Sequence, residues 1–268
     1  MASPDAAFAG SIPALYERHL GSMMFAPYAR ELAARLADLT SGRLLEIAAG
    51  TGIVTTALRE RLPSAVEIVA TDLNPAMIAV ATEKPGMDGV EWLPADAQEL
   101  PFGDGEFDVL TSSFGVMFFP DRNAGYREAV RVLRPGGRYV FTVWDSLEHN
   151  DFTRIVNDVA EAAFPDDPPR FIPRTPFGYS DQAAIRSDVL AAGFSDVGIE
   201  TVPLPCRASS PRDPAVGICQ GTPLRAEIEA RGGDLGAVTD AAAVAIEEAY
   251  GAGPVTSRMQ ALVVTAVR

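Results

Sequence analysis

The chain of 268 residues carries one lysine, Lys84, although 22 of its residues are Lys or Arg. Schiff-base chemistry and phosphate loops need a lysine in a particular setting, and Lys84 lies in neither. Cysteine is also scarce: Cys206 and Cys219 form no CxxC pair. They are too few for a structural zinc site, so we expect two reduced thiols and no bound metal.

Basic charge is lacking overall, because the formal net charge is −14. Without a cluster of Lys and Arg to replace counterions, neither nucleic acid nor an anionic membrane is an expected partner. No apolar run reaches the roughly 18 residues of a membrane helix. Asp5 and the cluster Glu17–His19 interrupt any leader-like pattern at the N-terminus. We therefore expect a soluble, cytoplasmic protein.

Short apolar runs alternate with helix-like segments in the first half of the chain, a pattern that predicts parallel βαβ units. Helical spacing covers 12–20 and 25–39, and helices are also expected at 53–61, after Asn74-Pro75, and from Asp121 to about Leu133. Five strands are expected, at 43–48, 66–71, 90–95, 107–112 and 138–143, the last after a tight turn at 134–137.

The second half of the chain has a different sequence pattern, with prolines concentrated at 164–177 and an irregular stretch expected at 203–214. Helices are expected at 181–192, 223–231 and 239–250, and strands at 193–202 and 259–267. We expect one domain over 1–268. It comprises a helical N-terminal cap (1–42), a core (43–144), and a remainder (145–268) in which a lid is inserted between the last two strands.

The first candidate site is the run Leu44–Gly52, in which a buried strand enters a glycine turn that opens a helix. Glycine lets the backbone approach a ligand closely. A dinucleotide fingerprint would need three glycines, but its positions hold Ala48, Gly50 and Ile53. The run therefore indicates a nucleotide-type site of another kind, and an ordinary strand-turn-helix junction is the alternative.

Two acidic residues follow the next two strands. Asp72 comes about 20 residues after the glycines, where a carboxylate can accept hydrogen bonds from ribose hydroxyls. Asn74 already provides the cap of the next helix, so Asp72 is free for that role. Asp96 could accept from an adenine amino group, although alone it would read as a solvated loop residue. All three features lie where open parallel sheets bind ligands.

Together these motifs resemble those of the class I S-adenosylmethionine-dependent methyltransferases, in particular the branch of ubiquinone and menaquinone C-methyltransferases and small-molecule enzymes. The resemblance covers about 43–144 and rests on four runs: Glu46–Gly52, Asp72–Met77, Asp96–Phe102 with Phe107-Asp108, and Arg131–Gly137. Ala48 departs from the pattern, because many members have glycine there. The resemblance implies an α/β, Rossmann-like fold. Its sheet is mostly parallel, with seven strands of which the last is antiparallel, and helices cover both faces.

The resemblance also implies S-adenosylmethionine as cofactor and a role for each matching position. Glu46 should support the loop, and Ala48, Gly50 and Gly52 should pass close to the methionine part. Asp72 should bind the ribose, Leu73 and Met77 the adenine ring, and Asp96 and Ala97 its amino edge. Ser113 and Phe114 should border the sulfonium. The remaining cofactor-binding candidates are Thr51 and Gln98 within the loops, and Tyr16 and Phe25 as pocket walls contributed by the cap.

Methyl transfer from a sulfonium depends chiefly on positioning, and a base is needed only where the acceptor loses a proton early. His149, after the fifth strand, is the candidate base retained; His19, Asp145 and Glu17 are further candidates. For Tyr16, Phe25 and His149 an ordinary packing or surface role is the alternative.

The sequence predicts a methyltransferase acting on a small, partly apolar molecule, and it is compatible with a homodimer. Two other interpretations remain open. One is a regulatory protein that binds the cofactor without catalysis. The other is an NAD(P)-dependent reductase, which the missing glycines and the lack of a Tyr-x-x-x-Lys pair disfavour. Neither the acceptor nor the methylated atom, carbon, oxygen or nitrogen, follows from the sequence.

Overall fold

The computed structural model describes residues 12–268, so the first eleven residues of the predicted cap, Asp5 among them, lie outside the described residues. The chain forms two compact units. Unit 1 comprises the residues up to Pro27, Trp144–Gly178 and Pro203–Gln260. Unit 2 comprises Tyr28–Val143, Tyr179–Val202 and Ala261–Arg268.

A seven-stranded sheet has the order β3-β2-β1-β4-β5-β7-β6. Its strands are β1 (Gly42–Ile47), β2 (Val66–Asp72), β3 (Val90–Pro94), β4 (Phe107–Ser113), β5 (Leu133–Trp144), β6 (Asp196–Ala208) and β7 (Val255–Val267). Strands β1 to β5 pair in parallel. Strand β7 is antiparallel to β5, because Gly137 bonds to Arg268 whereas Asp145, further along β5, bonds to Gln260. The predicted fold class is confirmed.

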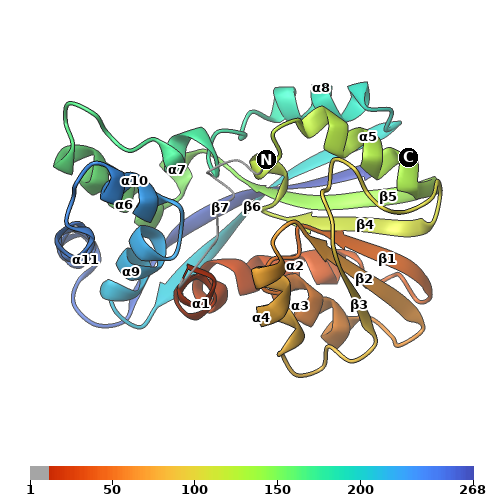
Figure 1. The fold of residues 1–268 in the computed structure, drawn as a ribbon, viewed down its shortest axis with the longest axis horizontal. Coiled ribbons are helices and arrows are strands. Elements are labelled where there is room, and N and C mark those ends of the chain that lie inside the picture. The colour runs from red at the N-terminus through yellow and green to blue at the C-terminus, as the bar shows by residue number, and fades with distance from the viewer. Residues whose placement is uncertain (1–11) are drawn as a thin grey trace. The chain divides into compact units, whose positions relative to one another are not determined.

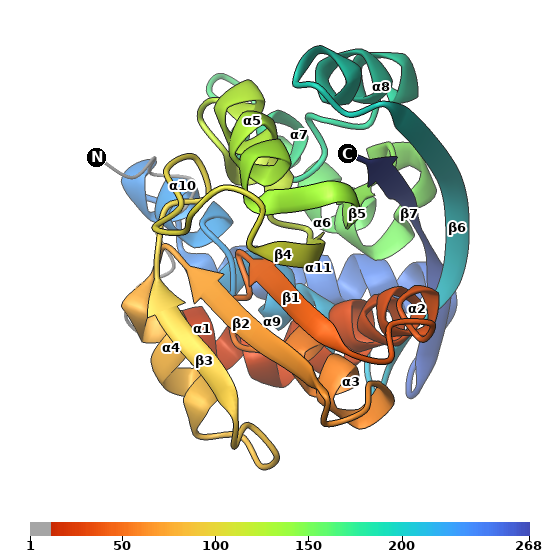
Figure 2. The same ribbon diagram turned by 90° about the vertical axis from the view of Figure 1, so that its right-hand side faces the viewer.

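The helices of unit 2 cover both faces of its strands (Figures 1 and 2). On one face, α2 (Ala26–Arg35) and α3 (Ile53–Arg61) pack on apolar side chains of β1, β2, β4 and β5. On the other face lie α5 (Arg122–Val132) and α8 (Gln182–Ala191), while α4 (Pro75–Thr82) packs beside β2 and β3. The expected caps are present: the side chains of Asn74 and Asp121 accept backbone amides of α4 and α5.

Unit 1 is mainly helical. It contains α1 (Ile12–Leu15), η2 (Tyr16–Phe25), η4 (Leu147–His149), α6 (Asp151–Ala163), α7 (Phe171–Arg174), α9 (Arg212–Gln220), α10 (Leu224–Ala230) and α11 (Leu235–Tyr250). Helix α9 packs against α6, α11 and η2. The predicted insertion between the last two strands is therefore α9 to α11. Helix η2 is a π-helix, within a segment where the spacing predicts ordinary helix. A further short helix, η3 (Val116–Phe118), follows β4 in unit 2.

Two expectations about local structure are wrong, and one helix has no counterpart among the expected elements. The predicted turn at 134–137 is a bulge inside β5: Phe107 and Val109 of β4 pair with Leu133 and Arg138. The stretch expected to be irregular at 203–214 is occupied by the end of β6 and the start of α9. Helix α6 was not predicted. Prolines 203 and 205 are compatible with a strand because β6 is an edge strand. Residues two apart in a strand have their backbone nitrogens on the same side, so both prolines can face the side that has no neighbouring strand and needs no N–H donor.

Candidate functional site

The loop after β1 is built from left-handed backbone positions. Ala48, Gly50 and Gly52 have φ of 55°, 56° and 76°. The Ala49 amide donates to the Thr71 carbonyl of β2 at 2.9 Å, which ties the loop to the neighbouring strand. Alanine adopts this left-handed conformation at a cost of about 1 kcal/mol, whereas glycine adopts it without strain. The loop therefore has at Ala48 the backbone conformation that is usual for glycine.

Asp72, the last residue of β2, holds the same loop from the other side. Its Oδ2 accepts the Gly50 amide at 2.7 Å and its Oδ1 accepts the Asn74 amide at 2.8 Å. Burial raises the pKa of Asp72, and the two amide bonds oppose that rise. A carboxylate has about four acceptor sites, so lone pairs remain for the hydroxyls of a ribose.

The glycines of this loop are required for different reasons. A Cβ on Gly52 would lie 3.0 Å from the Cβ of Ala81 and 3.1 Å from the Trp92 ring, so its small size serves packing. A Cβ on Gly50 would meet nothing within 4 Å. Gly50 therefore borders open space directly beside the Asp72 carboxylate, as a position for close ligand approach requires.

Glu46 lies beneath the loop, and 1% of its surface is exposed. Its Oε2 accepts a hydrogen bond from the Thr55 hydroxyl of α3 at 2.7 Å. Burial raises the pKa of Glu46 to about 8, the nearby Asp72 adds to the rise, and the Thr55 bond opposes it. The side chain joins β1 to α3 within the protein, and its role in supporting the loop for a cofactor stays a prediction.

The third predicted loop is a hydrogen-bonded turn. Asp96 Oδ1 accepts both the Gln98 amide at 2.9 Å and the Gln98 side chain at 3.0 Å. Gln98 Oε1 in turn accepts the Asp121 amide at 2.8 Å, which fixes the loop against the start of α5. Asp96 Oδ2 bonds to no residue in the described part of the chain. It is thus available for an adenine amino group.

The apolar residues predicted to lie against the adenine differ in exposure. Leu73 is 49% exposed, one of three large apolar side chains of the described residues with such exposure, whereas Met77 and Ala97 are buried. At the end of β4, the Ser113 hydroxyl lies 2.9 Å from that of Thr142, and the next residue, Phe114, has a φ of 54°. The predicted residues of unit 2 thus lie at or just beyond the carboxyl ends of four neighbouring strands, β3-β2-β1-β4, except Met77 in α4.

Tyr16 and Phe25 belong to unit 1. Their rings stack with centroids 4.7 Å apart. Phe25 contacts Trp144 at 6.1 Å, and Trp144 stacks on Phe177 at 5.9 Å. These four residues form one aromatic row, and the sequence did not identify Trp144 as a member. The role of Tyr16 and Phe25 as pocket walls stays a prediction.

The two histidines of the chain both lie beside aspartates in unit 1. His149 Nδ1 is 3.5 Å from Asp145 Oδ2, and His19 Nδ1 is 3.5 Å from Asp213 Oδ1. His19 joins η2 to α9, whereas His149 lies in the turn after β5. Sequence reasoning missed Gln260, which binds Asp145 at 2.6 Å, because no local signal connects residues 115 positions apart.

The described residues contain two buried thiols and no cluster of metal-ligating side chains. Both cysteines are buried, and burial raises the pKa of each thiol to about 12, so neither is a thiolate near neutral pH. Across residues 12–268, no three His, Cys, Asp or Glu side chains converge as metal ligands would. The same range contains no helix that is both long and apolar enough to cross a bilayer.

Comparison with known proteins gives consistent matches. A family model described as a methyltransferase domain matches residues 45–141. The demethylmenaquinone methyltransferase of Thermus thermophilus is 34% identical over 164 residues, covering 57% of this chain and 74% of that protein. The ubiquinone/menaquinone biosynthesis C-methyltransferase UbiE of Idiomarina loihiensis is 31% identical, covering 60% of this chain and 69% of that protein.

Solved structures share the fold at lower identity. The YcgJ protein from Bacillus subtilis superposes with a TM-score of 0.59 at 19% identity, covering 90% of this chain and 98% of that one. A Haemonchus contortus phosphoethanolamine N-methyltransferase 2, solved with S-adenosyl-L-methionine, gives a TM-score of 0.59 at 17% identity. It covers 96% of this chain and 56% of that one.

Proposed function

Because the chain belongs to the class I S-adenosylmethionine-dependent methyltransferases, we propose that it transfers the cofactor's methyl group to a small, partly apolar acceptor. One observation gives the proposal its strongest structural support. The Asp72 carboxylate holds the Gly50 amide at 2.7 Å, beside a backbone position with open space above it. A ligand with a ribose and a flexible charged tail suits such a cradle, and neither alternative from the sequence gains support.

In this proposal Asp72 binds the ribose, Leu73 and Met77 pack on the adenine, and Asp96 Oδ2 accepts its amino group. The bound cofactor supplies an electrophilic methyl on sulfur. The protein contributes position and orientation and keeps water out, because the displacement requires the acceptor atom in line with the bond that breaks. Ser113, the last residue of β4, and Phe114 directly after it border the reacting end.

For the acceptor we propose a planar, apolar ring. The relatives named above are methyltransferases of demethylmenaquinone and of ubiquinone and menaquinone biosynthesis. The aromatic row of unit 1, Tyr16, Phe25, Trp144 and Phe177, offers faces on which such a ring can stack. Reduced demethylmenaquinone is the first acceptor to test.

Calorimetric titration tests the cofactor directly. We expect S-adenosylmethionine and S-adenosylhomocysteine to bind with micromolar affinity, and NADH and NADPH not to bind. Gly50→Val should weaken binding about 100-fold or more, because its side chain fills the space that the ligand needs. Asp72→Ala should weaken it roughly 10- to 100-fold through loss of charged hydrogen bonds.

Gly86→Val is the matched control for Gly50→Val. Gly86 also has a positive φ, of 79°, and no atom within 4 Å of its Cβ position, but it lies between α4 and β3. Both variants carry similar backbone strain, so similar losses of thermal stability are expected, with cofactor binding lost only in Gly50→Val. Equal affinity in the two variants would contradict the assignment of this loop.

A further inference from the structure

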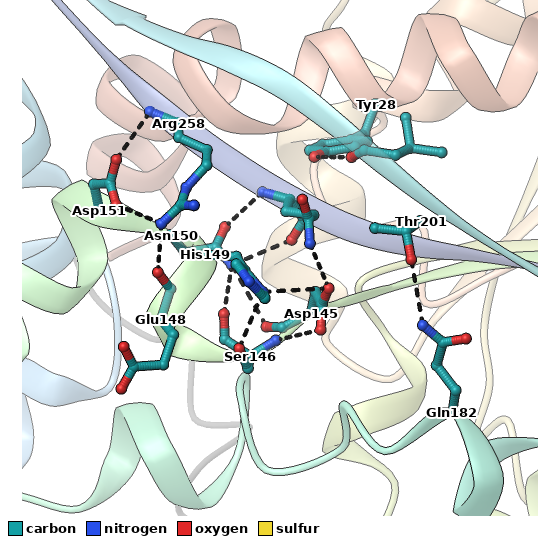
Figure 3. Close-up of polar contacts among 12 residues, drawn as sticks. Tyr28, Asp145, Ser146, Glu148, His149, Asn150, Asp151, Gln182, Thr201 and Arg258 are labelled. Carbon is teal, nitrogen blue, oxygen red and sulfur yellow. Dashed lines mark hydrogen bonds and ion pairs between the residues drawn. The ribbon is translucent and has the colours of Figure 1, made fainter.

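A short turn directly after β5 brings His149 to the carboxylate of Asp145 (Figure 3). The imidazole Nδ1 is 3.5 Å from Asp145 Oδ2 and 3.2 Å from the Ser146 hydroxyl. The side chain of Asp145 is 14% exposed, whereas that of His149 is 42% exposed. The turn thus places a partly buried acid behind an accessible imidazole.

Two hydrogen bonds hold the Asp145 carboxylate. Its Oδ2 accepts from the Gln260 side chain at 2.6 Å and its Oδ1 from the Ser146 amide at 2.7 Å. Buried Asn150 closes the turn on β7: its amide donates to the carbonyls of Ser146 and Gln260, and its oxygen accepts the Gln260 amide. The orientation of the carboxylate is therefore set before any ligand binds, as an active-site positioning residue requires.

We propose that His149, oriented by Asp145, accepts a proton from the methyl acceptor during transfer; this rests on the proposed function. With Nδ1 directed to Asp145 and Ser146, the proton-accepting atom is Nε2, which bonds to no residue within 12–268. A carboxylate behind an imidazole selects the tautomer with Nδ1 protonated and stabilises the imidazolium that forms.

Apart from Glu148, the other charged side chains near the turn are paired with one another. Arg258 of β7 binds Asp151 of α6 at 3.2 Å and donates to the Glu148 carbonyl, and Tyr250 of α11 also faces Asp151. Arg154 of α6 pairs with Asp158 at 3.0 Å. The Glu148 side chain neighbours His149 in sequence and forms no ion pair with a described residue. Asp145 is consequently the one carboxylate in contact with the imidazole among the described residues.

The topology of the sheet agrees with this role. Strand β5 pairs with β4 up to Ser113 and Thr142, and Asp145 follows Thr142 by three residues. The turn therefore begins at the carboxyl end of a strand next to β4, where open α/β sheets bind their ligands.

The acceptor class follows from the chemistry: a ring hydroxyl or ring carbon that loses a proton. A bond forms from the acceptor atom to the methyl carbon as the S–CH3 bond breaks, and the electron pair of that bond remains on sulfur in S-adenosylhomocysteine. The proton passes to Nε2 and then to solvent.

Imidazole NMR tests the geometry without any acceptor. The chain has two histidines, so each ring can be assigned with single variants. Long-range ¹H–¹⁵N spectra should show His149 with Nδ1 protonated in its neutral form. Asp145→Asn should shift the ring toward the Nε2 tautomer and leave His19 unchanged. A neutral His149 ring protonated on Nε2 in the unaltered protein would overturn the proposal.

Kinetics test the role, with reduced demethylmenaquinone and a panel of phenols, amines and thiols as acceptors. His149→Ala should lower kcat about 10²- to 10⁴-fold, remove the acidic limb of the pH profile, and recover activity with added imidazole. The affinity for S-adenosylmethionine should not change. Asp145→Asn should lower kcat less. His19→Ala removes the other histidine with an aspartate 3.5 Å away and should retain kcat.

The other possible outcomes distinguish a failure of the role proposed for His149 from a failure of the proposed methyltransferase function. Unchanged kcat in His149→Ala overturns the role of His149 and leaves the methyltransferase in place, as does turnover confined to acceptors with no proton to lose. Cofactor binding without turnover of any acceptor, or no cofactor binding, overturns the proposed function itself.

Discussion

The side chain of Ala48 restricts which residue can occupy position 115, on the loop after β4. Its backbone is left-handed, so its methyl group projects toward Gly115, where an added Cβ would lie 2.5 Å from the Ala48 Cβ. The same Cβ would lie 2.7 Å from the Ser112 hydroxyl. Gly115 is thus required to be glycine by a residue 67 positions earlier in the chain, and the alanine that departs from the family pattern has a structural consequence.

Glu46 should make the stability of the protein depend on pH. Its pKa is about 8 in the folded protein and near 4.5 in the unfolded chain, so the folded state binds this proton more tightly. The stabilising contribution is complete below about pH 4.5 and is lost as pH rises through about 8. Glu46→Gln removes this titrating group. We therefore expect the melting temperature of Glu46→Gln, relative to that of the unaltered protein, to increase as the pH rises from 5 to 9.

Glu67→Gln is the control for this prediction. Glu67 lies on the neighbouring strand β2 with its side chain 72% exposed, and its ion pair with Arg43 is a surface contact. Its melting curve should follow that of the unaltered protein at every pH. Parallel pH dependences for Glu46→Gln and the unaltered protein would show that Glu46 is not the titrating group.

At the scale of elements, η2 explains the pairing of Tyr16 with Phe25. In an α-helix, residues nine apart lie half a turn from each other and face opposite sides. The wider π-helix, in which the Ala26 amide bonds to the Gly21 carbonyl, lets the two rings stack at 4.7 Å. Apolar periodicity detects a helix here, but it cannot detect this change of pitch.

Asn150 joins two elements that are distant in sequence, the turn after β5 and strand β7. Asn150→Ala removes the four hydrogen bonds of this side chain and leaves the backbone amide of Gln260 without its partner, although the Gln260 carbonyl still accepts the Asp145 amide. We expect a loss of about 1–3 kcal/mol in the free energy of unfolding. Urea denaturation followed by circular dichroism measures it.

Asn123→Ala serves as the comparison for Asn150→Ala, because Asn123 is exposed on the first turn of α5. Its unfolding midpoint should change little. A similar midpoint for both variants would mean that the turn is held by other contacts.

For the whole molecule, the two units share strands: β6 and β7 each contribute residues to both. Cooperative unfolding should result, because melting either unit breaks strands of the other. The chain has two tryptophans, Trp92 in unit 2 and Trp144 in unit 1. We expect Trp92→Phe and Trp144→Phe, each reporting one unit by fluorescence, to unfold at the same urea concentration.

Circular dichroism of the same two variants provides the control, since it reports the stability of each variant independently of its fluorophore. After correction for any difference in stability, two separated fluorescence transitions would show that the units unfold independently. In that case the unfolding of unit 1 and that of unit 2 would be only weakly coupled, although the units share strands.

The sequence by itself determined where the loops proposed to bind the cofactor lie, and the order of most strands and helices. These features depend on local chemistry: left-handed backbone at Gly50 and Gly52, the cap at Asn74, and short apolar runs in the parallel strands. Such signals act within a few residues of one another and can be read without knowing the fold.

Only the tertiary structure decided the extent of β6, the aromatic row of unit 1, and the contacts of Asp145 with His149 and Gln260. A proline-containing segment becomes a strand when it lies at a sheet edge, and Gln260 orients Asp145 only after β7 pairs with β5. These features arise between residues far apart in the chain, whose meeting depends on the packing of the entire sheet rather than on the preferences of either segment.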